Sequence, residues 1–115
     1  LDAIDEIQKN HPDTIILLQG DHGSRFNKIK EYNGEGWENY VQEEMGILNA
    51  YYLPGVDPSK ALYPSISPVN SFRVVLNEYF GENLDLLEDH SYFEDWWGET
   101  YEDVTDRVGP ATTAP

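Results

Sequence analysis

The chain has 115 residues, which is enough for one small domain with a modest core. Hydrophobic residues make up 39% of it and aromatic residues 13%, and this composition argues against a wholly disordered chain. Seven basic and 22 acidic residues give a net charge of −15, which argues against nucleic-acid partners, and the lack of cysteine excludes disulfides and thiolate metal sites.

The first expected elements are a helix and a buried strand. Leu1, Ile4 and Ile7 recur at three-residue spacing, which indicates the end of an amphipathic helix that Pro12 stops. The run at 14–18 (TIILL) then predicts a strand. Because it is continuously apolar, we expect burial on both faces, as in a parallel sheet. Helix, short turn and buried strand form the second half of a βαβ unit, so we expect the first half to precede the chain.

The middle of the chain is expected to supply one short helix and a second strand. Residues 20–46 are mostly polar and lack a clear period, apart from a short helix expected around Trp37–Glu44. The apolar run at 47–53 ends at Pro54-Gly55 and predicts the second strand. Three prolines in residues 54–66 indicate a loop.

The clearest helix is expected at residues 68–80. Ser67 stands at its N-cap and Pro68 at its first helical position, and Gly81 follows as the residue that ends the helix. The apolar stripe that we expect to face the core consists of Val69, Phe72, Leu76, Tyr79 and Phe80.

The C-terminal third is acidic and rich in aromatic rings, which are Tyr92, Phe93, Trp96, Trp97 and Tyr101. These rings could form a platform for a sugar or a lipid, or could pack back onto the domain. A short edge strand is expected to include Val104-Thr105, and residues 109–115 are expected to be a flexible tail. The expected fold class is α/β, with two or three strands and flanking helices in residues 1–108.

Two metal-binding residue types follow the first expected strand. Asp21 and His22 stand between Gly20 and Gly23, and ligands of open parallel sheets bind beyond the carboxyl ends of the strands. A carboxylate and an imidazole suit Zn²⁺ or Mn²⁺, while the glycines allow a sharp turn. The residues alone leave a second interpretation open, in which Asp21 forms an Asx-turn and His22 is a loop histidine.

Other candidate residues also have two interpretations each. Arg25, Lys28 and Lys30 form a local cationic cluster that could steer an anionic ester, or they could lie in a solvated loop. His90 could add a ligand or contact a substrate anion, or it could be a loop histidine among acids. Arg73 is expected to pair with a carboxylate, with anion binding as the alternative.

Asp-His-Gly directly after a buried apolar strand resembles the distal metal motif of the alkaline phosphatase superfamily. The resemblance is closest to the branch of sulfatase-like proteins and phosphoglycerol or phosphoethanolamine transferases. Ile47–Gly55 (ILNAYYLPG) resembles the strand that follows the motif in that branch. Ser65–Gly81, Leu87–Phe93 and Tyr101–Arg107 resemble the helix, aromatic turn and closing segment near the end of membrane-anchored sulfatase-like proteins. Together these segments cover most of residues 10–107, in the same order.

The resemblance implies that Asp21 and His22 are both metal ligands, for Mn²⁺ or Zn²⁺, with Ca²⁺ or Mg²⁺ as alternatives. The fold implied is a fragment of an alkaline phosphatase-like sandwich. Gly20 departs from the family pattern, where Ser is more usual. The early metal-binding acid and the nucleophile of the family precede this region and map onto no residue here. The chain is therefore expected to be an inactive C-terminal portion of a metal-dependent hydrolase or phosphoryl or phosphoglycerol transferase.

The expected partners follow from the same resemblance. They are the N-terminal part of the same domain and, in the whole protein, an anionic ester, with self-association of the fragment as a further expectation. The parent is expected to be membrane-anchored with this domain outside the cytoplasm, and the fragment itself to be soluble. The alternative function is a non-catalytic acidic module, for binding or for structure, derived from a sulfatase-like domain. The sequence leaves the substrate, the nucleophile and the metal open.

Overall fold

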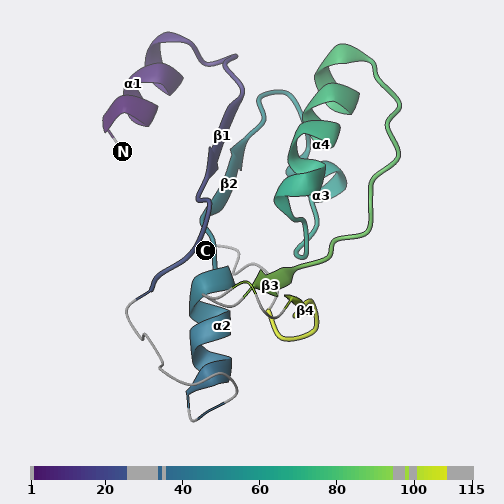
Figure 1. Ribbon diagram of the computed structural model, residues 1–115. Coiled ribbons are helices and arrows are strands. Elements are labelled where there is room, and N and C mark those ends of the chain that lie inside the picture. Colours follow the sequence, from purple (N-terminus) through teal and green to yellow (C-terminus); the bar gives the residue numbers. More distant parts are fainter. Residues whose placement is uncertain (1, 26–33, 35, 95–97, 99–100, 109–115) are drawn as a thin grey trace.

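The computed structural model describes residues 2–25, 34, 36–94, 98 and 101–108. Within them the chain is mixed α/β (Figure 1). In chain order the elements are α1 (Asp2–Asn10), β1 (Ile16–Gln19), α2 (Trp37–Met45), β2 (Asn49–Tyr52), α3 (Pro58–Ala61), α4 (Pro68–Phe80), β3 (Tyr92–Glu94) and β4 (Tyr101–Asp103). The described strands form two separate antiparallel pairs, β1 with β2 and β3 with β4.

The strand predicted from the first apolar run is confirmed, but its expected parallel environment is wrong. β1 pairs antiparallel with β2, so that Ile16 lies opposite Tyr52 and Gln19 opposite Asn49. Leu18 on β1 is 39% exposed, so the strand is not buried on both faces within the described residues. An unbroken apolar run records how much nonpolar contact a strand makes, but it does not encode the direction of the neighbouring strand.

α4 begins and ends where the sequence predicts. Pro68 occupies its first turn, and Gly81 ends the helix with a φ of 71°, the left-handed conformation that favours glycine. The backbone N–H of Gly81 donates to the carbonyl of Leu76 and so satisfies one of the last carbonyls of the helix. Pro68 and Gly81 predict the helix ends reliably because each residue restricts or permits a particular backbone conformation at its own position.

The face of α4 that the structure buries is not the face expected from the apolar stripe. Its four buried residues are Asn70, Ser71, Val74 and Val75. Four of the five stripe residues, Val69, Phe72, Leu76 and Phe80, are between 37% and 66% exposed. Helical periodicity shows which side chains share a face, but distant hydrogen-bond partners decide which face lies inward.

Residues 82–91, here called the return segment, run back along α4 in extended form (Figure 1). Asn77 accepts from the backbone N–H of Leu84 at 2.8 Å and donates to its carbonyl at 2.9 Å. Asn70 makes the same two bonds to Leu87, at 2.9 and 2.8 Å. Each asparagine amide therefore takes the place of the neighbouring strand that an extended backbone needs.

Two smaller expectations also change. Arg73 donates to the backbone carbonyl of Asp85 at 3.0 Å, and not to the carboxylate we expected. The expected loop at 54–66 contains α3, which forms because Asp57 accepts from the backbone N–H of Ser59 and Pro58 stands at the first helical position.

Two hydrophobic clusters hold the elements together. The aliphatic cluster has buried Leu53, Val74 and Val75 at its centre, with partly buried residues of β1, β2 and α3 around them. The aromatic cluster lies where α2, β3 and β4 meet, in the lower part of Figure 1. Its buried members are Trp37, Tyr40, Val41, Phe93 and Val104.

The expectations for the C-terminal region have mixed outcomes. The expected edge strand is confirmed only in part, because β4 ends at Asp103 and the expected residues Val104 and Thr105 lie just after it, with Val104 fully buried. Of the described rings, Phe93 packs into the aromatic cluster, whereas Tyr92 and Tyr101 stay exposed and stack on each other at 5.1 Å. Trp96, Trp97 and the expected tail at 109–115 lie outside the described residues. Within the described chain, no helix has the length and apolar character that crossing a membrane requires.

Candidate functional site

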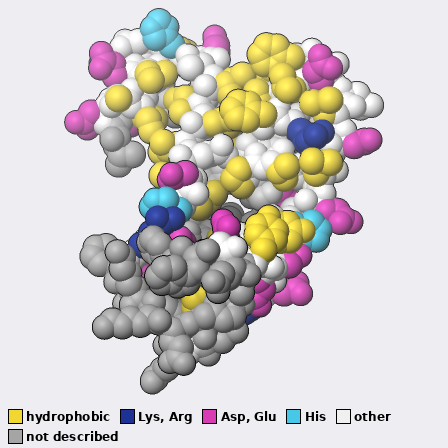
Figure 2. Space-filling view, in the orientation of Figure 1, with side chains coloured by type: hydrophobic (Ala, Val, Ile, Leu, Met, Phe, Trp, Pro, Cys, Tyr) yellow, Lys and Arg dark blue, Asp and Glu magenta, His cyan; other side chains and the backbone are white. Residues whose placement is uncertain are grey.

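A cleft of about 880 Å³ lies between the two clusters, and four of the described candidate residues, Asp21, His22, Arg25 and His90, line it. Asp21, His22 and Arg25 come from the segment after β1, and His90 comes from the end of the return segment. Figure 2 shows histidine and charged side chains of both signs at the waist between the two halves. The structure therefore places Asp21 and His90, which are 69 positions apart in the sequence (90 − 21 = 69), at the same cleft.

The side chains of Asp21 and His22 are each oriented by a contact with a neighbouring backbone group. The backbone N–H of His22 donates to Asp21 Oδ1 at 3.0 Å, and His22 Nδ1 lies 2.7 Å from the carbonyl oxygen of Gly23. Because a carbonyl can only accept, Nδ1 carries the proton in this contact, and in the neutral form of the ring Nε2 then has the free lone pair. That Nε2 lies 3.9 Å from Asp21 Oδ1. With side chains 93% and 44% exposed, Asp21 and His22 present two donor atoms to the cleft.

Gly23 is required by close contact with the end of α2. Its N–H donates to the carbonyl of Glu44 at 2.6 Å. A Cβ on Gly23 would lie 2.1 Å from the carbonyl oxygen of Glu43 and 2.8 Å from that of Gly46, distances that no side chain tolerates. A Cβ on Gly20 would meet nothing closer than 3.4 Å, which is ordinary van der Waals contact, so glycine is not required there for space.

The end of α2 also shapes the electrostatics of the motif. Carbonyls at a helix C-terminus carry partial negative charge, which favours a cation nearby. Arg25 already lies there, with Nε and Nη2 both 2.9 Å from Glu44 Oε1. Its guanidinium is thus held at the cleft wall by a carboxylate, and Lys28 and Lys30 lie outside the described residues.

A polar network fixes the end of β1 just before the motif. Gln19 Nε2 donates to Asn49 Oδ1 at 2.8 Å and to Ser71 Oγ at 2.6 Å. The hydroxyl of Tyr51 completes the contact with Ser71 at 2.7 Å. Sequence reasoning missed these residues, although polar side chains at the ends of two apolar runs were an available signal.

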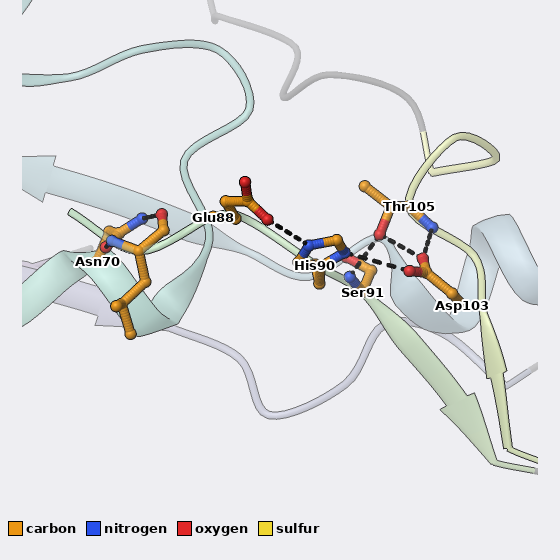
Figure 3. Close-up of polar contacts among 7 residues, drawn as sticks. Asn70, Glu88, His90, Ser91, Asp103 and Thr105 are labelled. Carbon is orange, nitrogen blue, oxygen red and sulfur yellow. Dashed lines mark hydrogen bonds and ion pairs between the residues drawn. The ribbon is translucent and has the colours of Figure 1, made fainter.

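His90 lies between two carboxylates (Figure 3). Its Nε2 is 3.2 Å from Glu88 Oε2 and its Nδ1 is 3.1 Å from Asp103 Oδ2. The hydrogen bonds to Glu88 and then to Asp103 raise the pKa of His90 above its ordinary value. Since both ring nitrogens face acceptors, His90 is suited to donate as an imidazolium. It is not placed as a third ligand, and no group of three or more potential metal ligands occurs in the described part of the chain.

Asp89 stands beside His90 and caps α4 from a distance. It accepts from the backbone N–H of Ser67 at 2.8 Å, from the Ser67 hydroxyl at 2.5 Å, from Tyr63 at 2.6 Å and from Asn70 at 3.1 Å. Partial burial opposes ionisation of Asp89, but these bonds outweigh it and hold its pKa below the usual range. Burial, and then the neighbouring Asp89, raise the pKa of Tyr63 to about 12. Sequence reasoning missed this cap because its partners are 19 to 26 positions away.

The arrangement offers a cation two protein donor atoms at an open cleft, with no hydroxyl or thiol assigned as a nucleophile. Comparison with known proteins adds no family to this geometry. No family model, no curated protein and no solved structure matches the chain.

Proposed function

We propose that the chain is the C-terminal portion of a sulfatase-like, metal-dependent hydrolase or phosphoryl or phosphoglycerol transferase, in which Asp21 and His22 are two of the metal ligands. The observation that supports this most is the orientation of His22. Its Nδ1 bonds to the Gly23 carbonyl, so that Nε2 and Asp21 Oδ1 lie 3.9 Å apart at the end of β1. Metal-binding histidines commonly donate their other ring N–H to a backbone carbonyl in this way.

The donor set fits a divalent ion. Two donors about 2.1 Å from a tetrahedral ion lie about 3.4 Å apart, so the exposed side chains of Asp21 and His22 would have to close their 3.9 Å separation by about 0.5 Å to bind one ion. An imidazole and a carboxylate suit Mn²⁺ or Zn²⁺ better than Ca²⁺ or Mg²⁺, which prefer oxygen ligands. When bound, such an ion would supply Lewis-acid stabilisation of charge on a transferring phosphoryl or sulfuryl group.

The roles of the other residues follow from their contacts. Gly23 lets the motif lie against α2, and the bonds of Gln19 to Asn49 and Ser71 hold the end of β1 in place. Arg25, paired with Glu44, would face an anionic ester at the cleft wall. With two ligands and no assigned nucleophile, the chain alone is expected to show no turnover of aryl sulfates or phosphodiesters.

Paramagnetic Mn²⁺ tests the proposal, because it broadens NMR signals near its site even when binding is weak. Substoichiometric Mn²⁺ is expected to broaden the amide signals of residues 20–24 and the His22 ring selectively. In Asp21→Ala that selectivity should disappear, while Asp13→Ala, which removes another exposed aspartate, should keep it. Equal broadening at acidic residues throughout the wild-type chain would mean that general acidity collects the ion, and would overturn the proposal.

One observation favours the alternative of a non-catalytic acidic module. Tyr92 and Tyr101 form a stacked, exposed pair with their rings 10° from parallel, and the His90 ring also stacks on Tyr92, with centroids 5.9 Å apart. Exposed stacked rings are typical of surfaces that bind sugar or aromatic rings. In that case Mn²⁺ would bind diffusely, and oligosaccharides would shift the NMR signals of both tyrosine rings.

A further inference from the structure

The outward face of α4 carries an apolar stripe that nothing described covers. Val69, Phe72, Leu76 and Phe80 occupy positions i, i+3, i+7 and i+11, and this set is here called the α4 stripe. Its side chains are between 37% and 66% exposed. Scattered exposed apolar residues need no explanation, but a contiguous stripe of large ones marks an interaction surface.

The helix cannot simply rotate to bury this stripe. Its inner face is committed to the network of Ser71 with Gln19 and Tyr51, which is fully buried at Ser71. One flank is committed to the return segment through Asn70 and Asn77, which hold the backbone at Leu87 and Leu84. Rotation would leave these polar groups without partners, at a cost that a few apolar contacts would not offset. The exposure of the stripe is therefore built into the fold.

The return segment gives the stripe a border of defined charge. Leu86 and Leu87 add exposed apolar surface, and the exposed acids of the same segment are Glu82, Asp85 and Glu88. Arg73, between the stripe and the segment, adds one positive charge, so these four charged side chains have a formal net charge of 1 − 3 = −2, with His90 beside Glu88 counted as neutral. Figure 2 shows the hydrophobic side chains gathered over this part of the molecule, with acidic side chains at the edge.

We propose that the α4 stripe and its acidic border form a docking surface for a cationic amphipathic helix. The apolar face of that helix would cover the stripe, and Lys or Arg along one flank would face Glu82, Asp85 and Glu88. A second copy of the chain fits poorly, because it would bring a net charge of −15 and an identical acidic border. Asp21 and His22 contribute nothing to this surface, so the Mn²⁺ experiment and the experiment on the α4 stripe give separate answers.

A designed peptide tests the surface directly. The probe is an 18-residue helix with Leu at three- and four-residue spacing, Lys along one flank, Ala and Gln elsewhere and a terminal fluorescein for anisotropy. We expect binding that weakens with added salt and that falls at least about tenfold in Phe72→Ser/Phe80→Ser, as for residues central to an interface. The control Leu48→Ser removes an apolar side chain of similar exposure elsewhere (56%, against 63% and 66% for Phe72 and Phe80) and should bind as the wild type does.

Two further comparisons separate the docking surface from general attraction. Removing the border charges in Glu82→Gln/Asp85→Asn/Glu88→Gln should weaken binding several-fold, while a peptide of the same composition with scrambled Leu positions should bind poorly. Circular dichroism checks that each variant keeps its helices, which is expected since the substituted side chains are exposed. Undiminished binding to Phe72→Ser/Phe80→Ser would overturn the proposal. A wild-type dimer that this double variant dissociates would also overturn it, because a second copy would then be the occupant.

Discussion

The aliphatic and aromatic clusters are stabilised in different ways. Around the aliphatic cluster, buried Asn70 and Ser71 fix the position of α4 through hydrogen bonds to other elements. In the aromatic cluster, Phe93 meets Trp37 edge-on at 5.2 Å and Tyr40 at 6.0 Å, so the shapes of rings fix the arrangement. Buried side-chain hydrogen bonds therefore position α4 in the aliphatic half, whereas ring packing together with exposed ion pairs, such as that of Arg107 with Glu38, joins the elements of the aromatic half. The candidate site lies between the two halves. The end of β1 holds it from the aliphatic half, and the C-terminal end of α2 holds it from the aromatic half.

The largest expected effect of a single change is in the aromatic cluster. Phe93→Ala should reduce the free energy of unfolding by about 3–5 kcal/mol, because it removes a buried ring that two others contact. Urea denaturation followed by tryptophan fluorescence measures the loss. Phe72→Ala makes the same substitution on the exposed stripe and should change stability by less than about 0.5 kcal/mol. Equal losses of stability in Phe93→Ala and Phe72→Ala would contradict the description of Phe93 as buried and Phe72 as exposed.

A smaller effect is expected at the boundary between the clusters. Gly23→Ala should cost about 1–3 kcal/mol, since its Cβ would collide with backbone carbonyls at the end of α2. Gly20→Ala, three positions earlier, has room for the methyl group and should be neutral within about 0.5 kcal/mol. Thermal unfolding of both variants makes the comparison. If Gly23→Ala were as stable as the wild type, the motif would not lie against α2 as described.

The hydrogen bonds that fix the start of α4 in the aliphatic half can be weakened by a substitution at Asp89. Asp89→Asn keeps one acceptor oxygen but loses the charge that four donors share, and should cost about 1–2 kcal/mol near neutral pH. Because folding lowers the pKa of Asp89, its contribution is present above the unfolded pKa near 3.8 and is lost as pH falls through the folded value. The difference between wild type and variant should therefore shrink in acid. Asp85→Asn, on the same segment and exposed, is the control.

The smallest effect concerns His90, which joins the return segment to β4. Its folded pKa is raised, so its stabilising contribution is complete below the unfolded pKa of about 6.5 and is lost as pH rises through the folded value. Wild type should thus exceed His90→Gln in stability at about pH 6, and the two should converge in alkali. NMR titration of the ring gives the pKa directly. A pKa at or below the ordinary value, or one unchanged in Glu88→Gln, would show that the carboxylates do not hold the ring.

Local signals in the sequence predicted much of this architecture. Pro68 and Gly81 predicted the bounds of α4, and the two apolar runs predicted β1 and β2, because these signals act on the backbone where they occur. The inward face of α4 and the antiparallel pairing depend instead on partners many positions away. Asn70 can be buried only because the backbone of Leu87 in the return segment supplies hydrogen-bond partners for its side chain.

The candidate site divides in the same way. Asp21 and His22 could be placed at a strand end from sequence, since an apolar run before a turn carries that information. The fit of Gly23 against α2 could not be predicted, because it depends on the packing of a helix some 20 residues later. The capping role of Asp89 was hidden for the same reason: an acid in an acidic stretch gives no signal of the four donors around it.

The two asparagines that hold the return segment impose a length rule on the chain. Asn70 and Asn77 are seven residues apart on a helix, a rise of about 10.5 Å, and their partners Leu84 and Leu87 are three residues apart in extended chain, about 10 Å. The two spacings coincide, so both anchors can close at once. One residue inserted between Leu84 and Leu87 would shift the extended chain by about 3.4 Å against the helix and leave one anchor unmade. Seven residues of α4 therefore span the same length as three residues of the extended return segment. An insertion between Leu84 and Leu87 should be tolerated far less well than one in the loop before Pro58.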